Sequence, residues 1–226
     1  MNPIYRSRLP HIHPIGATFF VTFNLKGAMP QAIVNMLNAQ KEANVKIIKA
    51  EKDEKMQQQL IREHKLHFKH FEQYLDNAPA ESPMWLREQK IVDIVKQGFE
   101  KQVEKQLYDM IAYCIMPNHV HALMDFSVQV RNANEEDFFL TQYVQLEKVL
   151  KDLKGSTARY ANLALERSGS FWHKDSYNHY VRNDAEYYNI IRYILQNPVK
   201  AKLVEKWEAW SNTYLNPLVP SNLFDV

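Results

Sequence analysis

The clearest signal in the chain is the stretch IMPNHVHALM at residues 115–124, where two histidines stand two positions apart inside an apolar run. Side chains alternate between the two faces of a strand, so His119 and His121 should point the same way and Val120 into the opposite layer. Two imidazoles on one face can hold one divalent metal ion and leave room for a third ligand. Two unrelated histidines would show the same spacing, so the motif needs support from a second segment.

Composition indicates an ordinary globular protein. The chain has 226 residues, 46% of them hydrophobic, which fits one domain carrying an insertion. A net charge of +2 neither indicates nor excludes a nucleic-acid partner. The single cysteine, Cys114, rules out an internal disulfide framework and suits a reducing compartment. No signal-peptide pattern opens the chain, and no apolar run approaches the roughly 20 residues that span a bilayer. We therefore expect a cytoplasmic protein without a membrane partner.

The order of predicted elements favours an α+β fold. Residues 18–23 are typical of a strand, residues 40–80 of a charged, exposed helical insertion, and residues 85–106 of an amphipathic helix. Further along, the patterns predict strands at 108–116 and 119–126, a helix over 141–165, an extended segment at 171–181 and a helix over 184–197. We predict a single domain over 1–226, a ferredoxin- or RRM-like sandwich with a central antiparallel sheet and helices packed on it.

The last predicted helix carries a candidate nucleophile. Asn183 has the form of its N-cap, and Pro198 should end it near residue 197. A helical wheel gathers an apolar stripe of Tyr187, Tyr188, Ile191, Ile194 and Leu195. Tyr193 lies off that stripe, four residues before Asn197. The Asn197 carbonyl could complete a metal site with the two histidines, and Tyr193 could attack a phosphate. A phenol with an ordinary pKa near 10 would need activation, and a half-exposed surface tyrosine would give the same pattern.

Several motifs, in order, resemble those of the REP-associated tyrosine transposases, a branch of the single-tyrosine HUH nucleases. They are the histidine strand at 116–121, a tryptophan-to-arginine motif at 171–182 and a tyrosine helix with its following turn at 192–204. Residues 16–23, residues 154–159 and the Trp207–Trp210–Ser211 tail add to the match. The resemblance covers most of the chain apart from the 40–80 insertion.

This resemblance implies a transposase that acts on single-stranded DNA carrying hairpins, such as REP elements. His119, His121 and Asn197 would bind Mg²⁺ or Mn²⁺. Tyr193 would attack a DNA phosphate, giving a 5′-phosphotyrosine link and a free 3′-hydroxyl, and the same link would allow strands to be rejoined. A nucleoid-associated protein is expected, as a monomer or a homodimer.

Basic residues near the motifs are candidates for DNA contacts. Lys174, Arg182 and Lys200 flank the motif residues, and Lys154 lies on a helix with a lysine at every third position from 148, which could equally be a solvated face. One departure from the family is Asn178, where aspartate is common, and its neutral amide could lower activity.

The other histidines invite weaker hypotheses. His11 and His13 form a second pair, more typical of a strand edge or a DNA-proximal feature than of a metal site. Three more, His64, His67 and His70, lie near Glu63 and Glu72 in the insertion, where we expect solvated side chains. His179 could orient a phosphate or be structural, and Trp172 should be a core anchor.

Two other functions stay open at this point. A domesticated hairpin-binding protein would keep the fold without efficient cleavage, a hypothesis that Asn178 and the insertion motivate. A metal-dependent phosphodiesterase using water would not need the Tyr193 hydroxyl.

Overall fold

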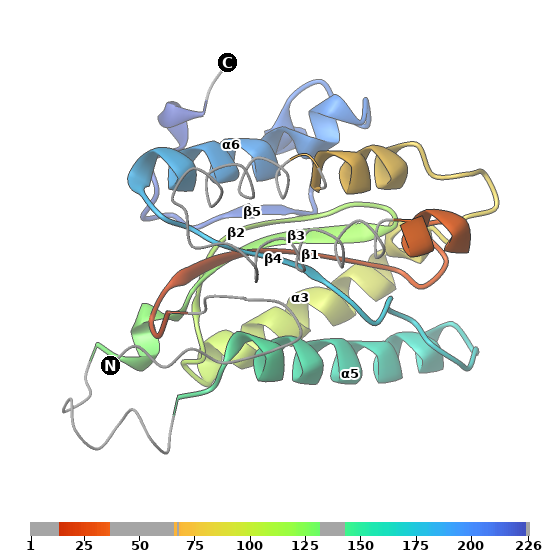
Figure 1. Cartoon of the computed structure of the whole chain (residues 1–226), viewed down its shortest axis with the longest axis horizontal. Coiled ribbons are helices and arrows are strands. Elements are labelled where there is room, and N and C mark those ends of the chain that lie inside the picture. The colour runs from red at the N-terminus through yellow and green to blue at the C-terminus, as the bar shows by residue number, and fades with distance from the viewer. Residues whose placement is uncertain (1–13, 37–65, 67, 132–142, 225–226) are drawn as a thin grey trace, which may run out of the picture.

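The computed structural model describes residues 14–36, 66, 68–131 and 143–224. Within them lies a five-stranded antiparallel sheet in the order β4-β1-β3-β2-β5 (Figure 1). The strands are β1 Thr18–Asn24, β2 Asp109–Ile115, β3 His119–Asp125, β4 Tyr177–Tyr180 and β5 Thr213–Leu215. The main helices are α3 Gln89–Glu104, α5 Leu146–Ala164 and α6 Asp184–Lys200, with helical residues also at 31–36 and 68–76. Short 3₁₀ turns lie at Trp85–Arg87, Phe126–Gln129, Trp207–Ala209 and Ser221–Leu223.

The topology confirms the predicted α+β sandwich. Helix α3 connects β1 to β2, and α5 connects β3 to β4, which gives the split arrangement of a ferredoxin-like fold with β5 added beside β2. Both of these helices pack on one face of the sheet, while α6 lies across the other (Figure 1). Gly98 allows α3 to approach α5 closely, because a Cβ there would come within 2.7 Å of Thr157 Cγ2. The prediction of a single domain over 1–226 stays a prediction.

The β2–β3 hairpin is built as the sequence indicates. Residues 117–118 form the turn, and the Met116 amide donates to the His119 carbonyl at 2.8 Å. The Leu25 amide donates to the Asn118 carbonyl at 2.9 Å, which joins the turn to the end of β1. The turn is therefore fixed from two sides, and the first histidine of the motif begins β3 directly after it.

Helix α6 begins as predicted but ends later. The Asn183 side chain accepts from the Glu186 amide at 2.9 Å, which confirms the N-cap. The prediction that Pro198 ends the helix near 197 is wrong, because the helix continues to Lys200. Its end is stabilised by Lys202, at φ 56°, whose amide donates to Val199, and by the next amide, which donates back to the Pro198 carbonyl. A proline in the last turn removes one hydrogen bond there but does not end the helix.

Three other predicted elements need adjustment. Helix α5 starts at Leu146 and not at 141, and residues 132–142 lie outside the described part. Of the extended segment 171–181, only Tyr177–Tyr180 is a strand, although Trp172 bridges to Leu25. Most of the 40–80 insertion also lies outside the described residues. Among the described helices, none is long and apolar enough to cross a membrane.

Candidate active site

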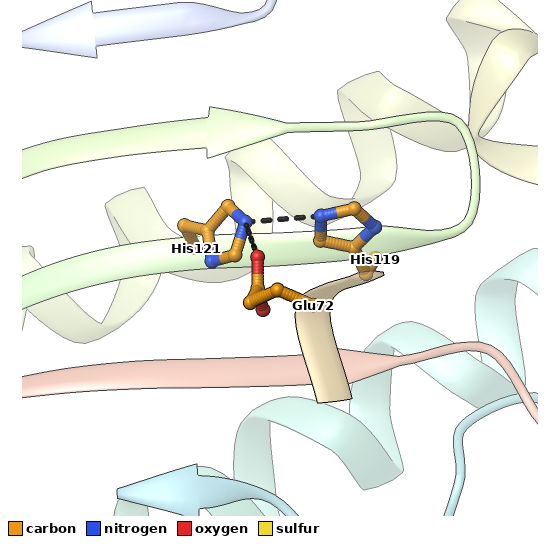
Figure 2. A group of neighbouring side chains, drawn as sticks. All are labelled: Glu72, His119 and His121. Carbon is orange, nitrogen blue, oxygen red and sulfur yellow. Dashed lines mark hydrogen bonds and ion pairs between the residues drawn. The ribbon is translucent and has the colours of Figure 1, made fainter. Parts of the chain in front are cut away.

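The paired histidines lie side by side on β3, on the face covered by α6. His119 and His121 are both fully buried, and their Nε2 atoms are 3.0 Å apart (Figure 2). Val120 between them packs in the hydrophobic core on the opposite face. The alternation expected from the sequence therefore holds, and the two imidazoles converge on one point.

Each histidine is oriented through its other ring nitrogen. His119 Nδ1 is 2.6 Å from Asn118 Oδ1, and His121 Nδ1 is 2.8 Å from Thr22 Oγ1. An amide oxygen can only accept, so His119 carries its proton on Nδ1 and presents a lone pair at Nε2. Metal-binding histidines are commonly held in this way by an oxygen at the outer nitrogen. The surroundings thus aim both Nε2 atoms at the shared point.

The third member of the cluster is Glu72, from the helical segment 68–76. Its Oε2 lies 3.2 Å from His121 Nε2, and one ligand atom each from Glu72, His119 and His121 lie within 4.8 Å of one another (Figure 2). Burial acts to raise the pKa of Glu72, but the charge and hydrogen bonding of His121 outweigh it, so the pKa lies below its usual value. The carboxylate is therefore held in its charged form.

The sequence-based expectation that this part of the insertion is exposed is wrong at Glu72, which is 6% exposed. A signal was present in the pattern: Phe68, Phe71 and Leu75 are apolar at helical spacing around it. A lone carboxylate within an apolar stripe is the kind of residue that needs a partner in the core. Here its partner is His121.

Tyr193 reaches the same cluster from α6. Its hydroxyl donates to Glu72 Oε2, and its ring crosses the His121 imidazole with centroids 5.4 Å apart. Burial, reinforced by the Glu72 charge, raises the pKa of Tyr193 well above its ordinary value. Lys200 Nζ lies 4.9 Å above the tyrosine ring and is the one predicted DNA contact placed directly against it among the described residues. Tyr188, assigned to the apolar stripe, is instead 41% exposed.

Asn197 lies one turn after the tyrosine and is 3% exposed. Its side chain hydrogen-bonds the Tyr193 hydroxyl, which slightly opposes the rise in the pKa of that group. Within the described residues its Oδ1 atom is buried and has no hydrogen-bond partner. A buried acceptor left unpaired in this way is suited to a cation.

The donor set fits a divalent metal ion. Two imidazole nitrogens and one carboxylate combine ligand types used for first-row divalent ions, and a carboxylate oxygen is a donor that Mg²⁺ and Mn²⁺ favour. The residues that could hold the ion are His119, His121 and Glu72, and Asn197 as a ligand stays a prediction.

The remaining predicted DNA contacts lie at varied positions. Lys154 Nζ donates to the Lys174 carbonyl at 2.9 Å and to Ser176 Oγ at 3.1 Å, so it ties α5 to the loop before β4. Burial lowers the pKa of Lys154 to about 8. Lys174 is exposed, and Arg182 Nη1 lies 3.8 Å from Glu186.

The other residues noted in the sequence have mostly structural surroundings. His179 Nε2 pairs with Glu186 Oε1 at 3.0 Å. Trp172 is buried and donates to Thr157 Oγ1 at 2.9 Å, as expected of a core anchor. Asn178 is half-buried, and its Oδ1 lacks a hydrogen-bond partner within the described part of the chain.

His70 is exposed, as expected. The remaining histidines discussed above, His11, His13, His64 and His67, lie outside the described residues.

Comparison with known proteins finds similarity to a curated protein and to a solved structure. The chain is 27% identical over 117 residues to a Haemophilus influenzae protein provisionally named a REP-associated tyrosine transposase; the match covers 51% of this chain and 63% of that protein. It is also similar to a solved structure of a REP-associated tyrosine transposase bound to a REP hairpin, with 15% identity, a TM-score of 0.47, and coverage of 94% of this chain and 82% of the other. No family model matches. The match to the Haemophilus influenzae protein confirms the resemblance drawn from the motifs.

Proposed function

We propose that this chain is a divalent-metal-dependent endonuclease and strand transferase for single-stranded DNA carrying a hairpin, with Tyr193 as its nucleophile. The observation that carries the proposal is the connection of Tyr193 through Glu72 to His121 and His119, within one buried cluster. The confirmed resemblance supports a DNA transposase, and a hairpin substrate agrees with the REP hairpin bound by the solved neighbour. Oligomeric state and a nucleoid location stay predictions.

The chemistry follows from which atoms face one another. A bound divalent ion would polarise the scissile phosphate as a Lewis acid. The Tyr193 oxygen would attack phosphorus while the phenolic proton passes to the Glu72 carboxylate, which already accepts its hydrogen bond. The bond from phosphorus to the 3′ oxygen breaks, leaving a 5′-phosphotyrosine and, once protonated, a 3′-hydroxyl. Rejoining reverses these steps with a 3′-hydroxyl as attacking group.

Two local features would help the phenol to react despite its raised pKa. Lys200 above the ring favours negative charge on it. The Glu72 carboxylate is charged and already accepts the phenolic hydrogen bond, so it is the group placed to receive the proton. Lys174 and Arg182 stay our predictions for phosphate contacts, whereas Lys154 would have to leave its internal acceptors to reach DNA.

The test is covalent capture of DNA. Purified protein is incubated with labelled single-stranded hairpin DNA from the flanks of its own gene in Mn²⁺, and denaturing gels are scored for a protein–DNA adduct. We expect an adduct that Tyr193→Phe reduces by at least about 10³-fold, because the variant removes only the attacking oxygen. Hairpin affinity should stay unchanged in the variant, whereas the melting temperature should fall slightly, because Glu72 loses the hydrogen bond from the phenol. An adduct at wild-type yield in Tyr193→Phe would contradict the assignment.

A domesticated DNA-binding protein is the second candidate. The Tyr193 hydroxyl, which has a raised pKa and is held by Glu72, and the neutral Asn178 favour it. This candidate predicts tight hairpin binding and no cleavage in any metal. A phosphodiesterase using water would instead cleave in Tyr193→Phe without forming an adduct.

A further inference from the structure

A pocket of about 370 Å³ opens directly beside the candidate nucleophile. It lies between α6, β4 and the helical segment 68–76, and Tyr193 forms part of its wall. The reactions described above do not use this space. Its walls therefore need a separate explanation.

One side of the pocket is aromatic. The rings of Phe68 and Tyr177 are stacked, with centroids 4.2 Å apart and planes inclined by 30°. Phe20 meets Phe68 edge-on at 5.5 Å, and Tyr193 lies 5.9 Å from each of these two phenylalanines. Clustered aromatic rings of this kind are the surfaces on which single-stranded nucleic-acid binders stack bases.

The other side of the pocket is polar and disfavours a phosphate. Glu186 contributes its carboxylate, which is paired with His179 and also accepts from the Arg182 amide at 3.0 Å. At the start of α6 the Glu186 amide donates to the Asn183 side chain, which occupies the place an anion would take at that amide. Asn189 adds an exposed amide, a group that can pair with both donors and acceptors on the edge of a base. Aromatic faces with amide and carboxylate acceptors fit a neutral heterocycle better than an anion.

We propose that this pocket holds one unpaired nucleobase of the DNA strand, next to the phosphate that Tyr193 attacks. The inference rests on the proposed function and deepens it, because it assigns the nucleotide that the site would recognise. Since Tyr193 is itself a wall, the seated base and the reacting phosphate belong to the same or adjoining nucleotides. A base held in a duplex could not enter, so the pocket would also select single-stranded DNA at the cleavage position.

The experiment removes bases one at a time. A hairpin with a single-stranded flank is prepared with an abasic site at each flank position in turn, and its affinity is measured with Tyr193→Phe protein, which cannot cleave it. We expect one position at which the loss of the base weakens binding about tenfold, the range that stacking of one base supplies. A 2-aminopurine at that position should show fluorescence quenching on binding.

Variants then place the base in this pocket. In Phe68→Ala, added to the same background, the abasic penalty at that position should fall below twofold, and Phe68→Tyr should restore it. Tyr188→Ala is the matched control, since that aromatic ring is on α6 but outside the pocket, and the penalty should stay at tenfold.

The outcomes separate this inference from the proposed function. Equal affinity for every abasic DNA would overturn the nucleobase pocket, even if wild-type protein forms adducts. If one flank position is sensitive but wild-type protein forms no adduct, the nucleobase pocket would be supported and the proposed nuclease activity would be contradicted. If Phe68→Ala fails to fold, the abasic scan with the Tyr193→Phe background still decides whether any base is seated.

Discussion

The two faces of the sheet are made by the same strands but differ sharply in polarity. Toward α3 and α5, strands β1 and β3 present only apolar side chains: Phe19, Val21, Phe23, Val120, Ala122 and Met124. Toward α6 the intervening positions include Thr22, Asn24, His119 and His121, all buried. Burying polar groups is costly unless they are hydrogen-bonded. One face is therefore specialised for stability, and the other accepts a cost for chemistry.

The apolar face should carry the largest single stability effect. Phe23 is fully buried and meets Trp172 edge-on at 4.9 Å. We expect Phe23→Ala to lower the free energy of unfolding by about 3–5 kcal/mol, through lost burial and a cavity. Urea unfolding followed by tryptophan fluorescence measures it. A loss below about 1 kcal/mol would show that this face is not the main source of stability.

The polar face should respond to metal instead. After chelation, Mn²⁺ at 100 times its dissociation constant should stabilise the folded wild-type protein by about 2.7 kcal/mol. His119→Ala should lose this increment, because one of two converging imidazoles is removed, while Phe23→Ala should keep it. Urea unfolding with and without Mn²⁺ gives both values. If Mn²⁺ stabilises His119→Ala as much as wild-type protein, the ion binds elsewhere and the two faces do not differ in their response to metal.

Sequence patterns predicted which face of the sheet a side chain lies on better than they predicted which residues form the candidate active site. Alternation in β3 was enough to place both histidines on one face, and the Asn183 cap fixed the start of α6. Glu72 was missed because its partner is His121, far away in the chain, and because its polar neighbours in the insertion hid a short apolar stripe. Local patterns specify which way a side chain points, whereas the partner it meets depends on tertiary packing.

A smaller effect, the dependence of stability on pH, should also separate the two faces. Burial, reinforced by the neighbouring His121, lowers the pKa of His119 to about 3. In the unfolded chain its pKa returns to about 6.5, so between these values the unfolded state binds a proton that the folded state does not. Stability from this group is complete above pH 6.5 and is lost as the pH falls toward 3.

For metal-free protein taken from pH 6.5 to pH 5, this loss amounts to about 1.6 kcal/mol, because the slope rises over this interval from half of about 1.4 kcal/mol per pH unit to nearly all of it. His119→Gln, which cannot titrate, should lose less stability over the same pH interval by about that amount. Phe23→Ala should keep the wild-type slope from a lower starting stability, because its change lies on the face without the histidines. Urea unfolding at both pH values provides the comparison. Parallel slopes in all three proteins would mean that His119 takes up its proton as readily in the folded protein as in the unfolded chain, and the polar face would then bear no electrostatic cost at this position.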